Sequence, residues 1–139
     1  MRARFLIPGA PYGKARHRTT RLGIQYTPKE TVNYETLVRT IFKQECPDWN
    51  ITFMPVRILI QAFYPIPKST SKKKLELMKL GKIVPTKRPD WDNIGKVITD
   101  SLNQIAWNDD AQVVDARVMK YYSGVPQVDV IIETIGDTS

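Results

Sequence analysis

The chain has 139 residues, of which 42% are hydrophobic and 25% are charged, the composition of one globular domain. It has no apolar run of about 18 residues, which excludes a transmembrane helix, and the apolar stretch before Pro8 is too short for a secretory signal. A single cysteine and a single histidine exclude an intrachain disulfide, a multi-cysteine metal site and a two-histidine zinc site. We expect one cytoplasmic domain over residues 1–139.

Charge is distributed unevenly along the chain. The net charge is +7, but residues 1–89 hold 18 basic and 5 acidic side chains, whereas residues 90–139 hold 3 basic and 9 acidic ones. A basic surface attracts polyanions, and carboxylates beside it can place metal ions against a bound phosphate. The pattern is compatible with nucleic-acid binding and, equally, with a soluble protein whose charges are simply uneven.

Residues 2–26 predict two strands joined by a loop. Arg2–Ile7 has the composition of a strand, and Leu22–Tyr26 can form a return strand after a segment rich in Pro and Gly. Four cations lie between the two predicted strands or border them: Lys14, Arg16, Arg18 and Arg21.

A helix is expected next. Thr27 can cap it, Pro28 suits its first position, and Glu30 can close a capping box. Cys46-Pro47 ends it. Five side chains recur at the spacing of one buried helix face: Tyr34, Leu37, Val38, Ile41 and Phe42.

Val56–Tyr64 is dense in β-branched and aromatic residues and predicts a central, buried strand. The segment that follows, Pro65–Pro89, holds eight basic residues and one acidic residue. It is either a solvated insertion or a flap that contacts phosphates, and its place directly before an acidic cluster favours the flap. Within this basic flap, Ser69–Leu80 can form a short helix. Three apolar side chains are expected to anchor that helix: Leu75, Met78 and Leu80.

The C-terminal third predicts an amphipathic helix over Asp92–Ile105 and two strands, Gln112–Tyr122 and Gln127–Thr134. A short turn with Gly and Pro separates the strands, so we expect an antiparallel hairpin. Apolar and polar residues alternate in the last strand, which predicts one packed face and one wet face. The fold class is therefore α/β (α+β), a single compact domain with a small mixed β-sheet packed with helices.

Carboxylates gather between positions 90 and 115, where all six are aspartates: Asp90, Asp92, Asp100, Asp109, Asp110 and Asp115. Asp90 follows a proline and should be extended, so that Asp90 and Asp92 point the same way. On the helix, Asp92, Lys96 and Asp100 share the face opposite the aliphatic one. The loop before the next strand can bring Asp109 or Asp110 back to the first pair, with the other carboxylate in support.

Each part of this cluster also has a purely structural interpretation. Asp92 can be a helix cap, the column of Asp92, Lys96 and Asp100 an exposed ion-pair ladder, and Asp109-Asp110 a turn. Their joint occurrence directly after a basic segment favours a metal site. Oxygen-only ligands suit Mg²⁺, with Mn²⁺ as a substitute, and Lys96 is a cation placed where a phosphate gains charge. The combination predicts metal-assisted phosphodiester hydrolysis.

Two other motifs fail on inspection. Gly9–Lys14 is one residue short of a phosphate-binding P-loop and is followed by alanine, so we expect no nucleotide cofactor. The segment from Asp90 begins like a calcium-binding loop, but Ile94 and Ser101 stand where that loop requires oxygen ligands.

A longer pattern is more specific. Arg88-Pro89-Asp90-Trp91-Asp92-Asn93-x-x-Lys96-x-x-x-Asp100-x-Leu102-Asn103, followed by Asp109-Asp110-x-Gln112-Val113, resembles the RusA family of Holliday-junction resolvases, small endonucleases typical of phages and prophages. The match is close over residues 84–122. The resemblance implies a mixed α/β fold, a homodimer, and Mg²⁺-dependent paired nicking of four-way DNA in recombination and repair.

The resemblance also implies roles for individual residues. Asp90, Asp92 and Asp110 correspond to the metal-binding aspartates and, with the essential lysine Lys96, form the catalytic set. Asp100 and Asp109 match common positions of the family and are expected to support the metal-binding set. The cluster at residues 14–18 has the character of a DNA-binding loop, although it does not align residue by residue. The residues expected to contact DNA are Arg88, Lys87, Lys14, Arg16, Arg18, Lys72, Lys73 and Lys74.

Paired nicks give the dimer a physical rationale, because one small domain carries one site and a two-fold pair supplies two in matching orientation. The expected partners are thus branched DNA and a second copy of the chain, with no membrane. Two alternatives remain at this point: a non-catalytic protein that binds branched DNA, and a nuclease that acts on flaps or single strands.

Overall fold

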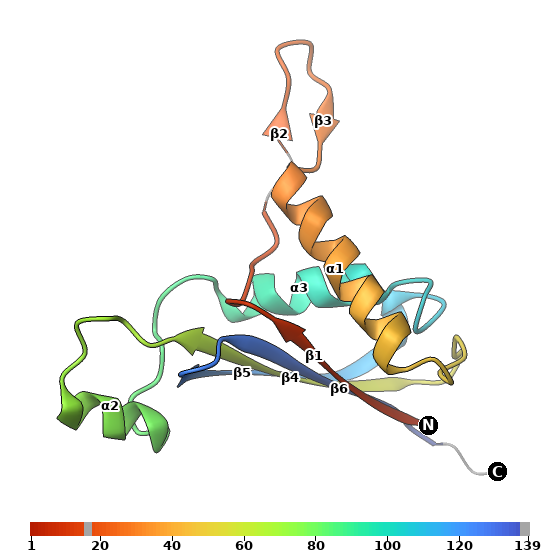
Figure 1. The fold of residues 1–139 in the computed structure, drawn as a ribbon. Helices are drawn as coiled ribbons and strands as arrows, with labels where there is room; N and C mark the ends of the chain where they lie inside the picture. Colours follow the sequence, from red (N-terminus) through yellow and green to blue (C-terminus); the bar gives the residue numbers. More distant parts are fainter. Residues whose placement is uncertain (16–17, 137–139) are drawn as a thin grey trace.

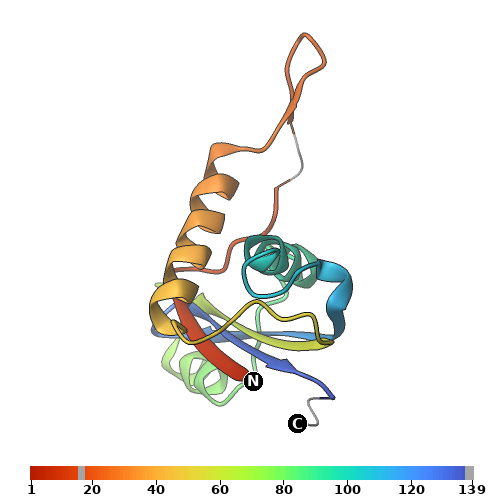
Figure 2. The ribbon, with the colours of Figure 1, turned by 90° about the vertical axis from the view of Figure 1, so that its right-hand side faces the viewer.

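The computed structural model describes residues 1–15 and 18–136. A four-stranded sheet carries two long helices on one face (Figures 1 and 2). The strands of this sheet are β1 (Arg2–Pro8), β4 (Val56–Pro65), β5 (Val113–Ser123) and β6 (Gln127–Thr134). The two helices are α1 (Lys29–Glu45) and α3 (Trp91–Leu102). This arrangement confirms the predicted α+β class with a mixed sheet.

Two smaller elements project from the body. One is a hairpin of β2 (Arg18–Thr19) and β3 (Gln25–Tyr26), which rises above the helices. The other is α2 (Lys72–Lys79), which belongs to the basic flap. It lies beyond the end of β4 and below the sheet in Figure 1, away from α1 and α3. The predicted return strand is thus present but spans only the last two of the residues expected. None of the helices in the described part of the chain has the length and apolar composition needed to span a bilayer.

The strand order is β1-β6-β4-β5, with β4 antiparallel to β6 and parallel to β5. The prediction that the last two strands pair as a hairpin is therefore wrong, because β4 lies between them. Two strand spacings amount to about 10 Å, which the short link Gly124–Pro126 can span. Strand β4 lies in the interior of the sheet, as predicted. Every second side chain of β4, from Val56 to Tyr64, is buried.

The core lies between the sheet and the two helices. The predicted apolar face of α1 packs there, with Val38 and Phe42 buried, and so does the aliphatic face of α3. Trp107, just beyond α3, is fully buried as well. Side chains from α3 and β4 dominate the packed layer: Ile94, Val97, Ile98, Ile58, Ile60 and Ala62. This packing fixes α3 on the sheet, and its opposite face is left for polar residues.

Both long helices differ from the prediction at their starts. Pro28, with φ −56° and ψ 145°, occupies the N-cap of α1, which has no side-chain cap, so the expected cap by Thr27 is wrong. Asp90, with φ −72° and ψ 152°, occupies the N-cap of α3, so Asp92 is not a cap but lies in the first turn. In both cases the extended backbone at or after a proline sets the boundary. Helix α3 ends at Leu102, three residues earlier than expected.

Two expectations about exposure also fail. Leu80 does not anchor the flap helix: it is 70% exposed, because α2 ends there and the chain turns at Gly81. Met78, also expected to anchor it, is buried as predicted. On β6, Asp129 lies on the face expected to be wet yet is 5% exposed, because it pairs with the Arg4 guanidinium at 2.9 Å on the neighbouring strand.

Candidate functional site

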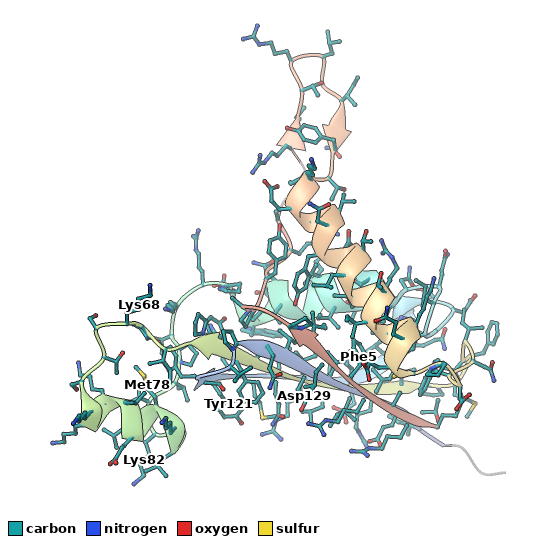
Figure 3. The ribbon with its side chains drawn as sticks, in the orientation of Figure 1. Phe5, Lys68, Met78, Lys82, Tyr121 and Asp129 are labelled. Atoms are coloured by element: carbon teal, nitrogen blue, oxygen red, sulfur yellow. The ribbon has the colours of Figure 1, made fainter. Side chains whose placement is uncertain are left out.

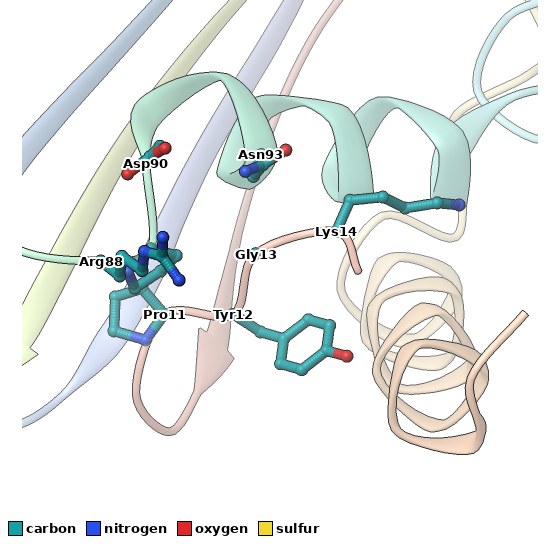
Figure 4. A pocket seen from close by; sticks show the side chains of 8 residues that line it. Pro11, Tyr12, Gly13, Lys14, Arg88, Asp90 and Asn93 are labelled. Atoms are coloured by element: carbon teal, nitrogen blue, oxygen red, sulfur yellow. The ribbon is translucent and has the colours of Figure 1, made fainter. Parts of the chain in front are cut away.

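A pocket of about 780 Å³ opens where the loop after β1 meets the start of α3 (Figure 4). The backbone N–H of Lys14 donates to the carbonyl of Asn93 at 2.9 Å, which ties the loop to the helix. Gly13 makes this approach possible, since a Cβ there would lie 2.7 Å from the Cβ of Pro89. Eight residues line the pocket: Pro11, Tyr12, Gly13, Lys14, Arg88, Pro89, Asp90 and Asn93.

The segment that carries Asp90 is held by its backbone. Tyr64 donates its hydroxyl to the carbonyl of Pro89 at 2.7 Å, and Lys120 donates its ammonium to the carbonyl of Lys87 at 2.7 Å. Both donors come from the neighbouring strands β4 and β5. Alternate carbonyls are thus drawn to the sheet, and the side chains of Arg88 and Asp90 are left exposed beside the pocket.

Cations and rings reinforce this anchor. The ammonium of Lys120 lies 5.1 Å from the ring centre of Tyr64, and that of Lys87 lies 5.8 Å from the ring centre of Tyr122. Burial raises the pKa of Tyr64 to about 12, and the nearby carboxylate of Asp90 adds to the rise. Tyr64 is therefore a neutral hydrogen-bond donor at physiological pH. Sequence reasoning missed Tyr64 and Lys120, whose role depends on which strands are neighbours.

Asp110 lies at the other end of α3 and is held through its own side chain. Trp107 donates its indole N–H to Asp110 Oδ1 at 2.7 Å, and Asn103 Oδ1 accepts from the Asp110 backbone N–H at 3.1 Å. Burial raises the pKa of Asp110 despite the opposing Trp107 hydrogen bond, and the charges of Asp100 and Asp109 raise it further. The adjacent Asp109 has a different task, because its side chain caps the short 3-10 turn Asp110–Gln112.

Lys14 lies inside the structure and joins three elements. Its ammonium is 3.0 Å from Asp100 Oδ2 on α3 and 3.5 Å from Glu35 Oε2 on α1, and its side chain is 14% exposed. Burial lowers the pKa of Lys14, but the two carboxylates outweigh it, so the pKa lies above its usual value. The structure thus shows Lys14 as an internal ion-pair partner, while its expected contact with DNA stays a prediction.

The aspartates form two groups along α3. Asp90 and Asp92 lie at its start, whereas Asp100 and Asp110 lie near its end. Asp92 and Asp100 are eight residues apart. At 1.5 Å per residue their Cα atoms are separated by about 12 Å along the helix. Lys96 is exposed between the two groups.

Within residues 1–15 and 18–136, no three Asp, Glu, His or Cys side chains lie close enough to enclose a metal ion. The donors still fit Mg²⁺, which is usually bound by one or two carboxylates together with substrate phosphates rather than by a protein cage. Asp115, the sixth aspartate of the cluster, belongs to neither group, since it pairs with Arg57 at 2.8 Å.

Cationic side chains border this helix on two sides. The arm, residues 18–26, carries Arg18 and Arg21, both exposed. The basic flap carries Lys72, Lys73 and Lys74 at the exposed start of α2, and Figure 3 shows Lys68 and Lys82 on the same projection. Lys87 and Arg88, at the end of the flap, are exposed next to Asp90. Arg16, also expected to contact DNA, lies outside the described residues.

A small α+β domain that displays aspartates and a lysine along one helix, between two cationic projections, has the features of an enzyme that acts on nucleic-acid phosphates. The family model described as Endodeoxyribonuclease RusA matches residues 8–133, and the chain belongs to this family. It is also similar to the uncharacterized protein YqaN of Bacillus subtilis (strain 168), with 36% identity over 137 residues that cover 95% of this chain and 96% of that protein. The expected family membership is confirmed.

Proposed function

We propose that the protein is a Mg²⁺-dependent endonuclease that resolves four-way DNA junctions by paired, symmetric nicks. Family membership supports endonuclease chemistry on DNA. The observation that carries the proposal is the presentation of Asp90: its backbone is anchored to two strands through Pro89 and Lys87, while its carboxylate is exposed at a pocket beside Arg88.

Asp90, Asp92 and Asp110 would hold one or two metal ions, Asp90 and Asp92 at the start of α3 and Asp110 near its end, each together with substrate phosphates and with Mn²⁺ as a substitute for Mg²⁺. When bound, the ion supplies Lewis-acid stabilisation of the phosphate and an activated water. Asp110 brings a carboxylate with a raised pKa, so it gives up its proton less readily than an ordinary aspartate until a cation is present. Asp109 supports Asp110 by capping the 3-10 turn, and the negative charge of Asp100, which raises the pKa of Asp110, favours a cation beside it.

Lys96 would act on the reacting phosphate. It is exposed on α3 between the two groups of aspartates, where its ammonium can stabilise the charge that develops in the transition state. Arg88 and Lys87 would grip the phosphates on either side of the scissile bond, because both are exposed next to Asp90. The arm and the basic flap would bind the DNA arms, and the affinity should fall steeply with salt.

Two copies of the chain would act together. Symmetric resolution needs two nicks on strands related by a two-fold axis, and each copy carries one site. We therefore propose a homodimer bound to one four-way junction, with no membrane and no nucleotide cofactor involved.

The test is cleavage of a labelled synthetic four-way junction in Mg²⁺ or EDTA, with a linear duplex of matched sequence as substrate control. Asp90→Asn is compared with the wild type and with Asp48→Asn, an exposed aspartate in the turn after α1 that lies outside the pocket. We expect paired nicks in Mg²⁺ for the wild type and for Asp48→Asn, and binding without cleavage for Asp90→Asn.

Two results would contradict the proposal. Binding by the wild type without a cut in either Mg²⁺ or Mn²⁺ would leave a non-catalytic protein that binds branched DNA. Faster cutting of a three-way substrate, with unpaired nicks, would indicate a flap or single-strand nuclease.

A further inference from the structure

The arm stands away from the body of the protein in both views (Figures 1 and 2). Its two short strands pair with each other, Arg18 opposite Tyr26 and Thr19 opposite Gln25. An isolated two-stranded hairpin of this size gains little stability from its own contacts. Because the arm contributes little to the core, we expect it to serve binding and not the stability of the fold.

The tip of the arm has a defined shape. Gly23 donates its backbone N–H to the carbonyl of Thr20 at 3.0 Å, and Thr20 donates to the carbonyl of Ile24 at 2.9 Å. Gly23 has a φ of +79°, the left-handed conformation that closes a three-residue hairpin loop. The turn therefore places Arg21 and Leu22 together at the apex.

Apolar side chains are concentrated at this tip. Leu22 is 87% exposed and Ile24 is 59% exposed. Leu22 has the largest exposed fraction of the large hydrophobic side chains in the described residues. Polar residues usually occupy a hairpin tip in water, so an apolar apex indicates a surface that something else covers.

The charge around the tip identifies the kind of partner. Residues 1–29 contain no Asp or Glu, and Arg18 and Arg21 are exposed beside the apolar side chains. A second copy of the chain would bring a net charge of +7 toward this cationic tip. DNA offers both complements at once, phosphates for the guanidinium groups and stacked bases for the apolar apex.

We infer that the arm inserts Leu22, supported by Ile24, between base pairs at the centre of a four-way junction, while Arg18 and Arg21 bind the flanking phosphates. The inference rests on the proposed function and names the part of the junction that the arm recognises. Leucine and isoleucine are among the wedges that proteins insert between base steps. Unstacking costs less at the exchange point than within a continuous duplex, because two of the four strands leave the helix there.

The experiment places the fluorescent base 2-aminopurine at the crossover of a four-way junction, where its emission rises when the base loses its stacking partner. The protein carries Asp90→Asn, so that the junction is bound without being cut. In this background, Leu22→Ser with Ile24→Ser is compared with the intact arm and with Phe53→Ser. Phe53 is the control, because it is an apolar side chain with 73% exposure that lies outside the arm, the basic flap and the pocket.

We expect the intact arm and Phe53→Ser to raise the emission at the crossover, and the double arm variant to abolish most of that rise. Junction affinity should fall about tenfold in the double variant, the effect of leaving one leucine side chain in water. Affinity for a matched linear duplex, which has no interrupted stack, should change little.

An emission rise that survives in the double variant would overturn the inference, because the tip would not reach the bases. A double variant that becomes monomeric at concentrations where the wild type is dimeric would overturn it too, because the tip would then contact a second copy. Failure of the proposed function is distinct: the wild type would not cut the unmodified junction in Mg²⁺, whatever the tip does to the fluorescent base.

Discussion

The two ends of α3 carry the same functional group in different surroundings. At the start of the helix, Asp90 is exposed and is positioned through its backbone, which Tyr64 and Lys120 anchor to the sheet. Near the end, Asp110 is half-buried and positioned through its side chain, which accepts the indole N–H of Trp107. The Asp90 carboxylate therefore stays hydrated, whereas burial removes part of the hydration of the Asp110 carboxylate.

The difference shows how one helix can offer carboxylates with distinct properties. The charge of an exposed aspartate costs the fold little, whereas burial raises the pKa of Asp110 and makes its charge unfavourable in the folded protein. In the proposed function, stability is given up at the second position to place a carboxylate that a cation can satisfy. Such an exchange is expected where a residue is kept for function.

The largest expected effects separate the two ends directly. Asp90→Asn and Asp110→Asn should each lower junction cleavage at least about a hundredfold. Their melting temperatures should differ: Asp110→Asn should be more stable than the wild type, because it removes a half-buried charge and keeps an oxygen for Trp107, while Asp90→Asn should melt like the wild type. Cleavage assays and thermal unfolding at pH 7 test both points. Equal melting temperatures would break the comparison.

Lys96 lies between the two ends of α3 and is expected to act on the reacting phosphate. Lys96→Met should reduce cleavage about a hundredfold, because the charge that develops on the phosphate loses its ammonium partner. Junction affinity should change little, since one of many cations is removed. Lys43→Met, an exposed lysine in the last turn of α1, is the control and should leave cleavage unchanged. A parallel loss of affinity and cleavage would instead make Lys96 a binding residue.

Tyr64→Phe tests the backbone anchor at the start of α3. Loss of the hydrogen bond to the Pro89 carbonyl should cost about 1 kcal/mol of unfolding free energy. Cleavage should fall about tenfold, with a higher Mg²⁺ concentration needed for half-maximal rate, because Asp90 is held less well. Tyr121→Phe is the matched control: Figure 3 shows Tyr121 on the sheet face away from the helices, where its hydroxyl donates to the Met119 sulfur at 3.3 Å. If both variants behave alike, Tyr64 has no special role.

The smallest expected effect is a shift of the pH profile through Asp110. Its pKa is raised in the folded protein, so protonation, and with it loss of cleavage, begins at a higher pH than for an ordinary aspartate. The same linkage means that the folded state loses stability as the pH rises through that pKa. Trp107→Phe removes the hydrogen bond that opposes this rise and should move the acid limb slightly higher still. An acid limb that does not move would show that another group controls it.

Local patterns predicted the elements whose character is local. The apolar faces of α1 and α3 follow from their helical spacing, the central place of β4 from its composition, and the polar column of Asp92, Lys96 and Asp100 from the turn of a helix. The start of α1 shifted by one residue because the extended backbone at Pro28 was counted into the helix, whereas α3 begins one residue earlier than expected, at Trp91, because Asp90 and not Asp92 is its N-cap.

Features that depend on distant neighbours were not predictable in this way. The contact of Tyr64 with Pro89 arises because β4 passes beneath the start of α3, and the ion pairs of Lys14 arise because α1 and α3 meet beside the loop. The failed hairpin has the same origin, since the adjacency of β5 and β6 in sequence is overridden by the insertion of β4. Periodicity in the sequence predicts which face of a helix or strand is buried. Which other elements pack against that face depends on the packing of the whole chain.

The insertion of β4 between β5 and β6 has a consequence for folding. Two consecutive strands can ordinarily zip together as soon as their turn forms, within microseconds. Here the last two strands have no such route, because each pairs with a strand made some fifty or more residues earlier, as in the pairs Ile58–Ala116 and Ile58–Ile132. The sheet therefore assembles from long-range contacts, which favour slow folding. During synthesis, β4 must wait for nearly the whole chain before its partners arrive.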